Sequence, residues 1–200
     1  MTRCATKRAM VRQFEYSWLR ALSKDYADFW QVTEDALVFA AKRLNVTMSA
    51  KKRELLMSAY LELKAWVDVP PVLNMLKKAG LKLALLSNFT PAMLRAAVNN
   101  SRLEGLFEHM LSTDAVRTYK PDPRAYQLAT DAFRLTPQQI AFVAFGGWDA
   151  AGARTFGFPT FWANRMNFPP EELGRAAQST SSAIEGLTDF VGLPRRTSWP

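Results

Sequence analysis

The sequence predicts an α/β fold, in which helices cover both faces of a parallel sheet and a helical part precedes that sheet. Residues 1–69 show the apolar spacing of helices and no strand pattern. From Pro70 onward, short apolar runs alternate with helical segments, as in a parallel sheet. The 200 residues are 48% hydrophobic and 12% aromatic, which is enough for a substantial packed core.

Three amphipathic helices are expected before residue 67. Phe14, Trp18 and Leu22 are four residues apart, so they share one face of a helix. The same spacing continues through residues 29–44 and again through residues 51–66. These helices would form a small helical layer.

The alternating elements of the second part follow from apolar runs and their boundaries. Helices are expected at residues 69–80, 91–100, 122–133 and 149–156, and strands at 81–87, 109–113, 140–145 and 158–164. Thr90 and Pro91 are typical of a helix N-cap and first turn, and Gly157 is typical of a helix end.

Polar residues follow several of the expected strands. Parallel sheets of this kind bind ligands at the carboxyl ends of their strands. Those ends hold Ser87 with Asn88, the loop that contains Lys120, and the turn FGGWD that contains Asp149. We therefore expect the functional site at this edge of the sheet.

Charge and cysteine content restrict the partners and the compartment. Basic residues exceed acidic ones by 26 − 18 = +8, but they are scattered over the chain, so we expect no nucleic-acid partner. Such a charge also suits anionic small molecules. Cys4 is the only cysteine, which excludes an intramolecular disulfide and fits a reducing compartment. No apolar run reaches the roughly 18 residues of a membrane span, so we expect a soluble cytoplasmic protein with no membrane partner.

Five stretches of the chain resemble one known family. They are EYSWLRAL, DFWQVTEDAL, LLSNFTPAML, LFEHMLSTDAVRTYKPDPRAYQLA and WDAAGARTFGFPTFWANR. Together, and in this order, they are similar to the haloacid dehalogenase superfamily and within it to the type II (S)-2-haloacid dehalogenases. The resemblance extends from about Val11 to Leu193.

The resemblance implies a Rossmann-type three-layer core with a helical cap. The expected parts are an irregular N-terminus at 1–12, the cap at 13–69, the α/β core at 70–193 and a tail at 194–200. It also implies a hydrolysis in two steps. An aspartate attacks the carbon that carries the halogen and expels halide with inversion, and water then cleaves the aspartyl ester. The implied substrate is a small 2-halocarboxylate, and homodimers are common among the relatives.

The attacking aspartate has no counterpart that we can assign. In the family it ends the first core strand, in a motif like DxYGT, ahead of the cap, and this sequence begins inside the cap. That strand lies between the strands expected here at 81–87 and 140–145. We therefore expect a parallel sheet in which this first strand is missing, and a chain that is N-terminally truncated and impaired as it stands.

The resemblance assigns catalytic roles to Lys120, Asp149, Asn88 and Tyr126. Lys120 would lie against the attacking carboxylate, where a compact cation lowers a carboxylate pKa and offsets developing charge. Asp149 would position the hydrolytic water and pair with the lysine. It could equally be a first-turn acid of its helix. Tyr126 matches the site tyrosine of the family, although a core tyrosine on an amphipathic helix is the equal alternative.

The implied substrate-binding residues are Ser87, Asn88, Phe29, Trp148, Gly146 and Gly147. Ser87 and Asn88 offer donors to a carboxylate, and their alternative role is a turn that caps the next helix. Phe29 and Trp148, with Tyr16 and Trp30 as weaker candidates, could line an apolar pocket. Where relatives carry Ser and Asn side chains, residues 144–147 offer only backbone N–H groups. The arginine that holds the substrate carboxylate in relatives aligns near Met10, and Arg8 or Arg12 could replace it only in a shifted register.

Single positions in the sequence bear on functions other than dehalogenation. A magnesium phosphatase of this superfamily carries a second carboxylate where this chain has Phe145, so we expect no metal and no cofactor. His109 opens an apolar run and is expected to be structural. The alternative to the enzyme is a non-catalytic remnant that binds small carboxylates or a partner protein, and a basic nucleic-acid binder is a further one.

Overall fold

The structure is a computed structural model that describes residues 3–193. Contacts divide the chain into two compact units. Unit 1 comprises Met1–Lys64, Ser87–Arg102 and Met110–Tyr119, and unit 2 comprises Ala65–Leu86, Leu103–His109 and Lys120–Pro200. Within the described part, no helix has the length and apolar character needed to cross a membrane. The expected tail at 194–200 lies outside the described residues.

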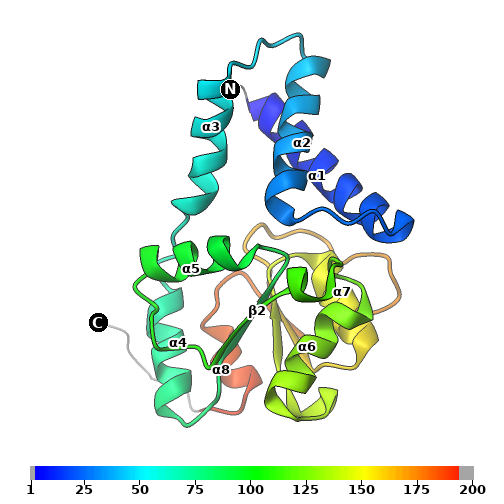
Figure 1. Cartoon of the computed structure of the whole chain (residues 1–200). Helices are drawn as coiled ribbons and strands as arrows, with labels where there is room; N and C mark the ends of the chain where they lie inside the picture. Colours follow the sequence, from blue (N-terminus) through cyan, green and yellow to red (C-terminus); the bar gives the residue numbers. More distant parts are fainter. Residues whose placement is uncertain (1–2, 194–200) are drawn as a thin grey trace. The chain divides into compact units, whose positions relative to one another are not determined.

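Unit 1 is helical. Its elements are α1 (Arg3–Ser23), α2 (Phe29–Arg43), α3 (Ala50–Ser58), the 3-10 turn η1 (Ala59–Leu61), α5 (Pro91–Asn100) and the 3-10 turn η2 (Thr113–Val116). Helices α1 and α2 pack side by side (Figure 1). Helix α2 begins where the Asp28 carboxylate accepts the backbone N–H of Gln31 at 2.8 Å, and its buried face includes Val32, Ala36 and Ala40. The predicted apolar spacing therefore does form the packed face of this helix.

Two expectations for unit 1 were wrong. Residues 1–12 were expected to be irregular, but α1 begins at Arg3. The segment contains good helix formers and neither Gly nor Pro, so the helix extends beyond its apolar stripe. The helix expected at 51–66 ends at Ser58 and continues only as η1. Trp66 instead packs in unit 2, where the Arg165 guanidinium lies 4.0 Å from its ring centroid, so tertiary packing overrides the local period.

Unit 2 contains most of the α/β part. Its elements are α4 (Val69–Lys78), α6 (Pro123–Phe133), the 3-10 turn η3 (Pro137–Gln139), β3 (Phe142–Ala144), α7 (Gly147–Phe156), β4 (Thr160–Ala163), β5 (Ser179–Ser181) and α8 (Gly186–Phe190). Strands β1 (Ala84–Ser87) and β2 (His109–Ser112) have residues in both units. The predicted alternation of strands and helices is confirmed.

The strands form two sheets in the described part of the chain. β1 and β2 pair in one sheet, and β3, β4 and β5 form the other in that order. The second sheet is parallel, with Phe142 opposite Thr160 and Phe161 opposite Ser179. Strands β1 and β3 therefore each have a strand partner on one side only. This arrangement agrees with the expectation that the strands near 81–87 and 140–145 are not neighbours.

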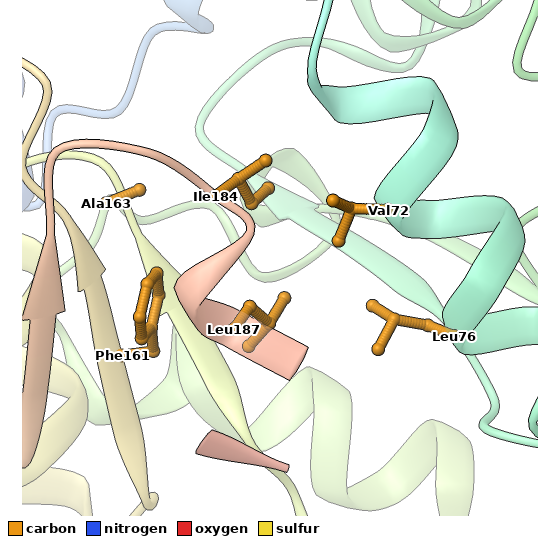
Figure 2. Close-up of a cluster of buried hydrophobic side chains, with 6 residues drawn as sticks. All are labelled: Val72, Leu76, Phe161, Ala163, Ile184 and Leu187. Atoms are coloured by element: carbon orange, nitrogen blue, oxygen red, sulfur yellow. The ribbon is translucent and has the colours of Figure 1, made fainter. Parts of the chain in front are cut away.

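The core of unit 2 lies between α4, β4 and α8. Its buried members are Val72, Leu76, Phe161, Ala163, Ile184 and Leu187. In Figure 2, Ile184 and Leu187 lie between the side chains of β4 and those of α4. Val72 and Phe161 are fully buried, and each such side chain contributes about 1.5–3 kcal/mol of transfer free energy. This cluster fixes α4 and α8 against the parallel sheet.

Strand β5 and helix α8 were not expected from the sequence. The residues of β5 are Ser, Thr and Ser, which show no apolar alternation. The strand is held by polar bonds: the Gln178 side chain accepts the Thr160 N–H at 2.8 Å, and the Thr180 hydroxyl donates to the Trp162 carbonyl at 3.2 Å. Backbone pairing with β4, which composition does not encode, creates this strand.

Candidate active site

A buried ion pair is the central feature of the candidate site. Lys120 Nζ lies 2.6 Å from Asp149 Oδ2, and the two side chains are 10% and 9% exposed. The same ammonium donates to the Leu86 carbonyl at 3.3 Å, at the end of β1. Asp149 stands in the first turn of α7, directly after β3. Lys120 thus joins the end of one sheet to the helix that follows a strand of the other.

Tyr126 completes this cluster from α6. Its hydroxyl donates to Asp149 Oδ1 at 2.9 Å, so both carboxylate oxygens are occupied, one by Tyr126 and the other by Lys120. The ring is fully buried and contacts Phe142, Phe156 and Phe158. Burial, followed by the negative charge and hydrogen bond of Asp149, raises the pKa of Tyr126 well above its usual range. The phenol is therefore a neutral donor at physiological pH.

The N-terminus of α7 places backbone N–H groups close to Asp149. Gly146 is the N-cap residue, and its carbonyl accepts the Ala150 N–H at 3.0 Å. An anion near Asp149 would face the positive end of the helix dipole. A side chain at Gly146 would collide with the Trp148 indole, because a Cβ there would lie 2.7 Å from Nε1. The centroid of this indole ring lies 6.0 Å from Lys120 Nζ.

Gly147 is restricted in the same way. A Cβ there would lie 2.9 Å from Glu171 Cγ and 3.3 Å from Trp162 Cζ2. The Trp162 indole N–H donates to the Phe145 carbonyl at 2.9 Å and so holds the loop that precedes α7. The predicted residues Gly146, Gly147 and Trp148 therefore form the N-cap and the start of α7, next to Asp149, and their substrate-binding role stays a prediction.

Ser87 and Asn88 belong to unit 1 and are held by a separate hydrogen-bond network. The Thr113 hydroxyl lies 3.3 Å from Asn88 Oδ1, and the Ser87 hydroxyl accepts the Phe89 N–H at 3.1 Å. The Ser112 hydroxyl donates to the Phe89 carbonyl at 2.6 Å. The Ser87 hydroxyl therefore does take the turn-forming role, and the binding role of Ser87 and Asn88 stays a prediction.

Phe29 lies within an aromatic cluster of unit 1. Its ring centroid is 5.3 Å from that of Phe89 and 6.4 Å from that of Tyr119. Tyr119 directly precedes Lys120, is 1% exposed, and donates its hydroxyl to the Ala27 carbonyl. Tyr26 packs against Tyr119 with tilted rings, 5.4 Å between centroids, and donates its hydroxyl to Asp114 Oδ1 at 2.8 Å. This cluster holds the segment that leads into Lys120.

Sequence reasoning missed Tyr119 and Thr113 as supports of the predicted site residues. The only local signal was that they precede Lys120 by one and seven residues, in the segment between a strand and a helix. Their partners are Ala27 and Asn88, which are distant in sequence, so hydrogen bonds across the fold could not be predicted.

Several weaker candidates have structural surroundings. Arg12 pairs with Glu15 at 2.6 Å and lies 4.3 Å over the Phe39 ring, and Tyr16 packs edge-on against Phe39. His109 lies edge-on against Phe133 at 5.0 Å, in agreement with its expected structural role. Among the described residues, no group of His, Cys, Asp or Glu has the arrangement of a metal site. Phe145, at the position where phosphatase relatives carry a carboxylate, packs against Trp66 at 6.2 Å.

The fold and the site define an α/β protein with a buried lysine–aspartate pair beyond the ends of its strands. Residues 5–157 match the family described as haloacid dehalogenase-like hydrolase. The chain is a member of the haloacid dehalogenase-like hydrolase family.

Its relatives within that family include dehalogenases of 2-haloacids. The chain is 47% identical to an (S)-2-haloacid dehalogenase of Pseudomonas sp. (strain YL) over 90% of this chain and 77% of the relative. It is 45% identical to (S)-2-haloacid dehalogenase 4A of Burkholderia cepacia over 80% and 69%.

Solved structures of L-2-haloacid dehalogenases are also similar to this chain. An L-2-haloacid dehalogenase superposes with a TM-score of 0.92 and 42% identity, over 94% of this chain and 85% of the other. The L-2-haloacid dehalogenase from Xanthobacter autotrophicus with chloropropionic acid covalently bound superposes with a TM-score of 0.87 and 32% identity, over 95% and 86%.

Proposed function

We propose that this protein is an (S)-2-haloacid dehalogenase-type hydrolase. It would replace the halogen on carbon 2 of a small 2-haloalkanoic acid by a hydroxyl group from water, through an aspartyl-ester intermediate. One observation carries the proposal: the Lys120–Asp149 pair is buried, capped by Tyr126, in a chain whose relatives are dehalogenases of this substrate class.

The cluster suits the two steps of this reaction. In the first, a carboxylate attacks carbon 2 and halide leaves with the bonding electrons. Lys120 would orient that carboxylate and offset its charge beside an anionic substrate. In the second, water attacks the carbonyl carbon of the ester, the hydroxy acid leaves, and one proton is released. Asp149 would hold this water, because its carboxylate is already fixed by Lys120 and Tyr126 and does not need to reorient.

Substrate binding would use the strand ends. Within unit 2, the backbone N–H groups near Gly146 and Gly147 would offer donors to the substrate carboxylate, and Trp148 would offer apolar surface for the carbon–halogen bond. For unit 1, the family resemblance implies that Ser87 and Asn88 bind the carboxylate and that Phe29 supplies apolar surface. These roles require no metal and no cofactor.

We assign no residue of this sequence to the attacking carboxylate. The alternative from a different class is a protein that binds small carboxylates, or a partner protein, without turnover. The lack of an assigned attacking carboxylate favours this binding protein. A phosphatase is less well supported, because Phe145 occupies the position of the metal-binding carboxylate.

The cysteine content and the exposed surface of α1 bear on the compartment and the oligomeric state. The single cysteine favours a reducing, cytoplasmic compartment. Leu19 and Leu22 of α1 are 58% and 82% exposed, which favours a homodimer that covers them. The partner is otherwise a small molecule.

Halide release from (S)-2-chloropropionate tests the proposal. A version fused at its N-terminus to a strand segment that ends in aspartate should release halide and form (R)-lactate, because one displacement inverts carbon 2. The matched control carries asparagine in place of that aspartate and should be inactive.

The outcomes separate the hypotheses. A folded fusion that stays silent with (S)-2-chloropropionate, yet binds it, would support the binding protein instead. Magnesium-dependent hydrolysis of p-nitrophenyl phosphate by the same protein would support the phosphatase.

A further inference from the structure

Gly152 of α7 lies where Tyr126 and Pro121 approach this helix closely. A methyl group at this position would lie 2.5 Å from the Tyr126 hydroxyl oxygen and 2.7 Å from Pro121 Cβ. It would also lie 3.3 Å from Tyr126 Cζ. Real Cβ atoms do not approach other heavy atoms as closely as the first two distances, so any side chain at residue 152 would displace its neighbours.

Those two neighbours hold the ion pair. Tyr126 donates to Asp149 Oδ1 at 2.9 Å, and Pro121 directly follows Lys120, whose ammonium lies 2.6 Å from Asp149 Oδ2. Asp149 and Gly152 are three residues apart on α7, so they lie on one face of the helix. The Tyr126 phenol therefore crosses over Gly152 to reach the carboxylate.

Backbone conformation does not explain this glycine. Gly152 lies inside α7 and has no positive φ, unlike Gly157, which ends the helix with a φ of 113°. A glycine in a helix interior is a weaker helix former than alanine. The adjacent buried positions Ala151 and Ala153 carry methyl groups. The space taken by Tyr126 and Pro121 is the remaining physical reason for glycine.

We propose that Gly152 is a positioning residue for the dehalogenase reaction. Its missing side chain lets α6 and the Lys120–Pro121 loop approach α7 closely enough for Tyr126 and Lys120 to bind the two oxygens of Asp149. The inference rests on the proposed function for its kinetic consequence and on the geometry alone for its structural one.

The side chain of Tyr126, which a methyl group at residue 152 would push, has little room to move. Tyr126 is 0% exposed and packed between Phe142, Phe156 and Phe158, so its ring cannot swing into solvent. A methyl group at residue 152 must move the phenol oxygen, the Lys120 loop or α7 itself. Each of these movements lengthens a hydrogen bond to Asp149.

Gly152→Ala tests the proposal in the halide-releasing form of the protein. We expect kcat to fall about 10- to 100-fold with a smaller change in KM, since misplacement of catalytic groups by about 1 Å can cost that much. Ala151→Gly is the control, because it weakens the same helix without touching Tyr126 or Pro121, and it should keep kcat near the parent value. A folded Gly152→Ala variant with parental kcat, and with unchanged distances to Asp149 in its crystal structure, would overturn the proposal.

A second measurement needs no activity. Urea unfolding of the parent, Gly152→Ala, Tyr126→Phe and the double variant forms a double-mutant cycle. Tyr126→Phe removes the oxygen at 2.5 Å, so Gly152→Ala should destabilise the Tyr126→Phe protein less than the parent. Additive effects would contradict the steric contact. If the fused parent releases no halide, the proposed function fails, and this cycle still decides whether Gly152 sets the approach of Tyr126.

Discussion

At the scale of single residues, the Lys120–Asp149 pair combines a stability cost with a functional geometry. Moving two charges out of water is expensive, and their attraction offsets that cost only when the remaining polar atoms are also bonded. Here Tyr126 and the Leu86 carbonyl supply those bonds. An intact pair is therefore tolerated, whereas a pair with one member removed leaves a buried charge without its main compensation.

Lys120→Ala should consequently affect both stability and turnover. We expect the free energy of unfolding to fall by about 3–5 kcal/mol, because Asp149 is left buried, and halide release by the fused protein to become undetectable. Asp149→Ala should abolish turnover as well. Urea titrations and a halide assay on the folded variants measure these effects.

Lys82→Ala is the matched control for that experiment. Lys82 pairs with Glu108 at 3.6 Å, but the side chains are 68% and 42% exposed. Such surface pairs contribute about 0–1 kcal/mol. If Lys120→Ala cost no more than Lys82→Ala, or left turnover near normal, the assigned role of the buried pair would be wrong.

At the scale of elements, helix boundaries with side-chain signals were predictable. Thr90 and Pro91 predicted the start of α5, and the Thr90 hydroxyl does accept the Met93 N–H at 3.3 Å. Gly157 ends α7 as expected. These signals are local, so one sequence suffices to identify them.

Thr90→Ala should therefore lower the free energy of unfolding by about 1 kcal/mol, the usual cost of a lost N-cap. Thr90→Ser keeps the accepting oxygen and should cost much less. Urea unfolding with an unchanged m-value would measure both. Equal losses for the serine and alanine variants would show that the hydroxyl is not the stabilising group.

Elements that depend on tertiary contacts were not predictable. Strand β5 exists because its backbone pairs with β4. The third helix ends at Ser58, before Trp66, whose ring instead lies 4.0 Å from the Arg165 guanidinium. The same distinction applies to the candidate site. Residue types at strand ends pointed to Lys120 and Asp149, and the family resemblance pointed to Tyr126, whereas the crowding at Gly152 depends on how α6 packs against α7.

At the scale of the whole molecule, a few charged contacts join segments that are far apart in the chain. Asp68, at the start of α4, accepts hydrogen bonds from Arg165 at 2.9 Å and from the Ile184 N–H at 3.5 Å. The Arg165 and Asp68 side chains are 10% and 17% exposed. This carboxylate therefore connects α4, the end of β4 and the segment before α8, all within unit 2.

The Asp68 carboxylate should make stability depend on pH. Burial alone would raise its pKa, but the bonds from Arg165 and Ile184 outweigh burial and lower the pKa below its ordinary 3.8. A carboxyl with a lowered pKa in the folded state stabilises that state above the ordinary pKa, and the contribution is lost as pH falls through the lowered one. The sign is thus a loss of stability on acidification below about pH 4.

Asp68→Asn should remove this dependence. At pH 7 we expect its free energy of unfolding to be about 1.5–3 kcal/mol lower than that of the parent, the usual range for a hydrogen bond to a charged group. The difference should shrink between pH 4 and about pH 2, where the parent carboxyl becomes protonated as well. Asp25→Asn is the control, since that side chain is 80% exposed and pairs with Arg20 at 3.2 Å, so its effect should stay below about 1 kcal/mol throughout. Urea unfolding from pH 2 to 7 measures both variants, and a constant difference for Asp68→Asn would mean that its charge does not hold the three segments together.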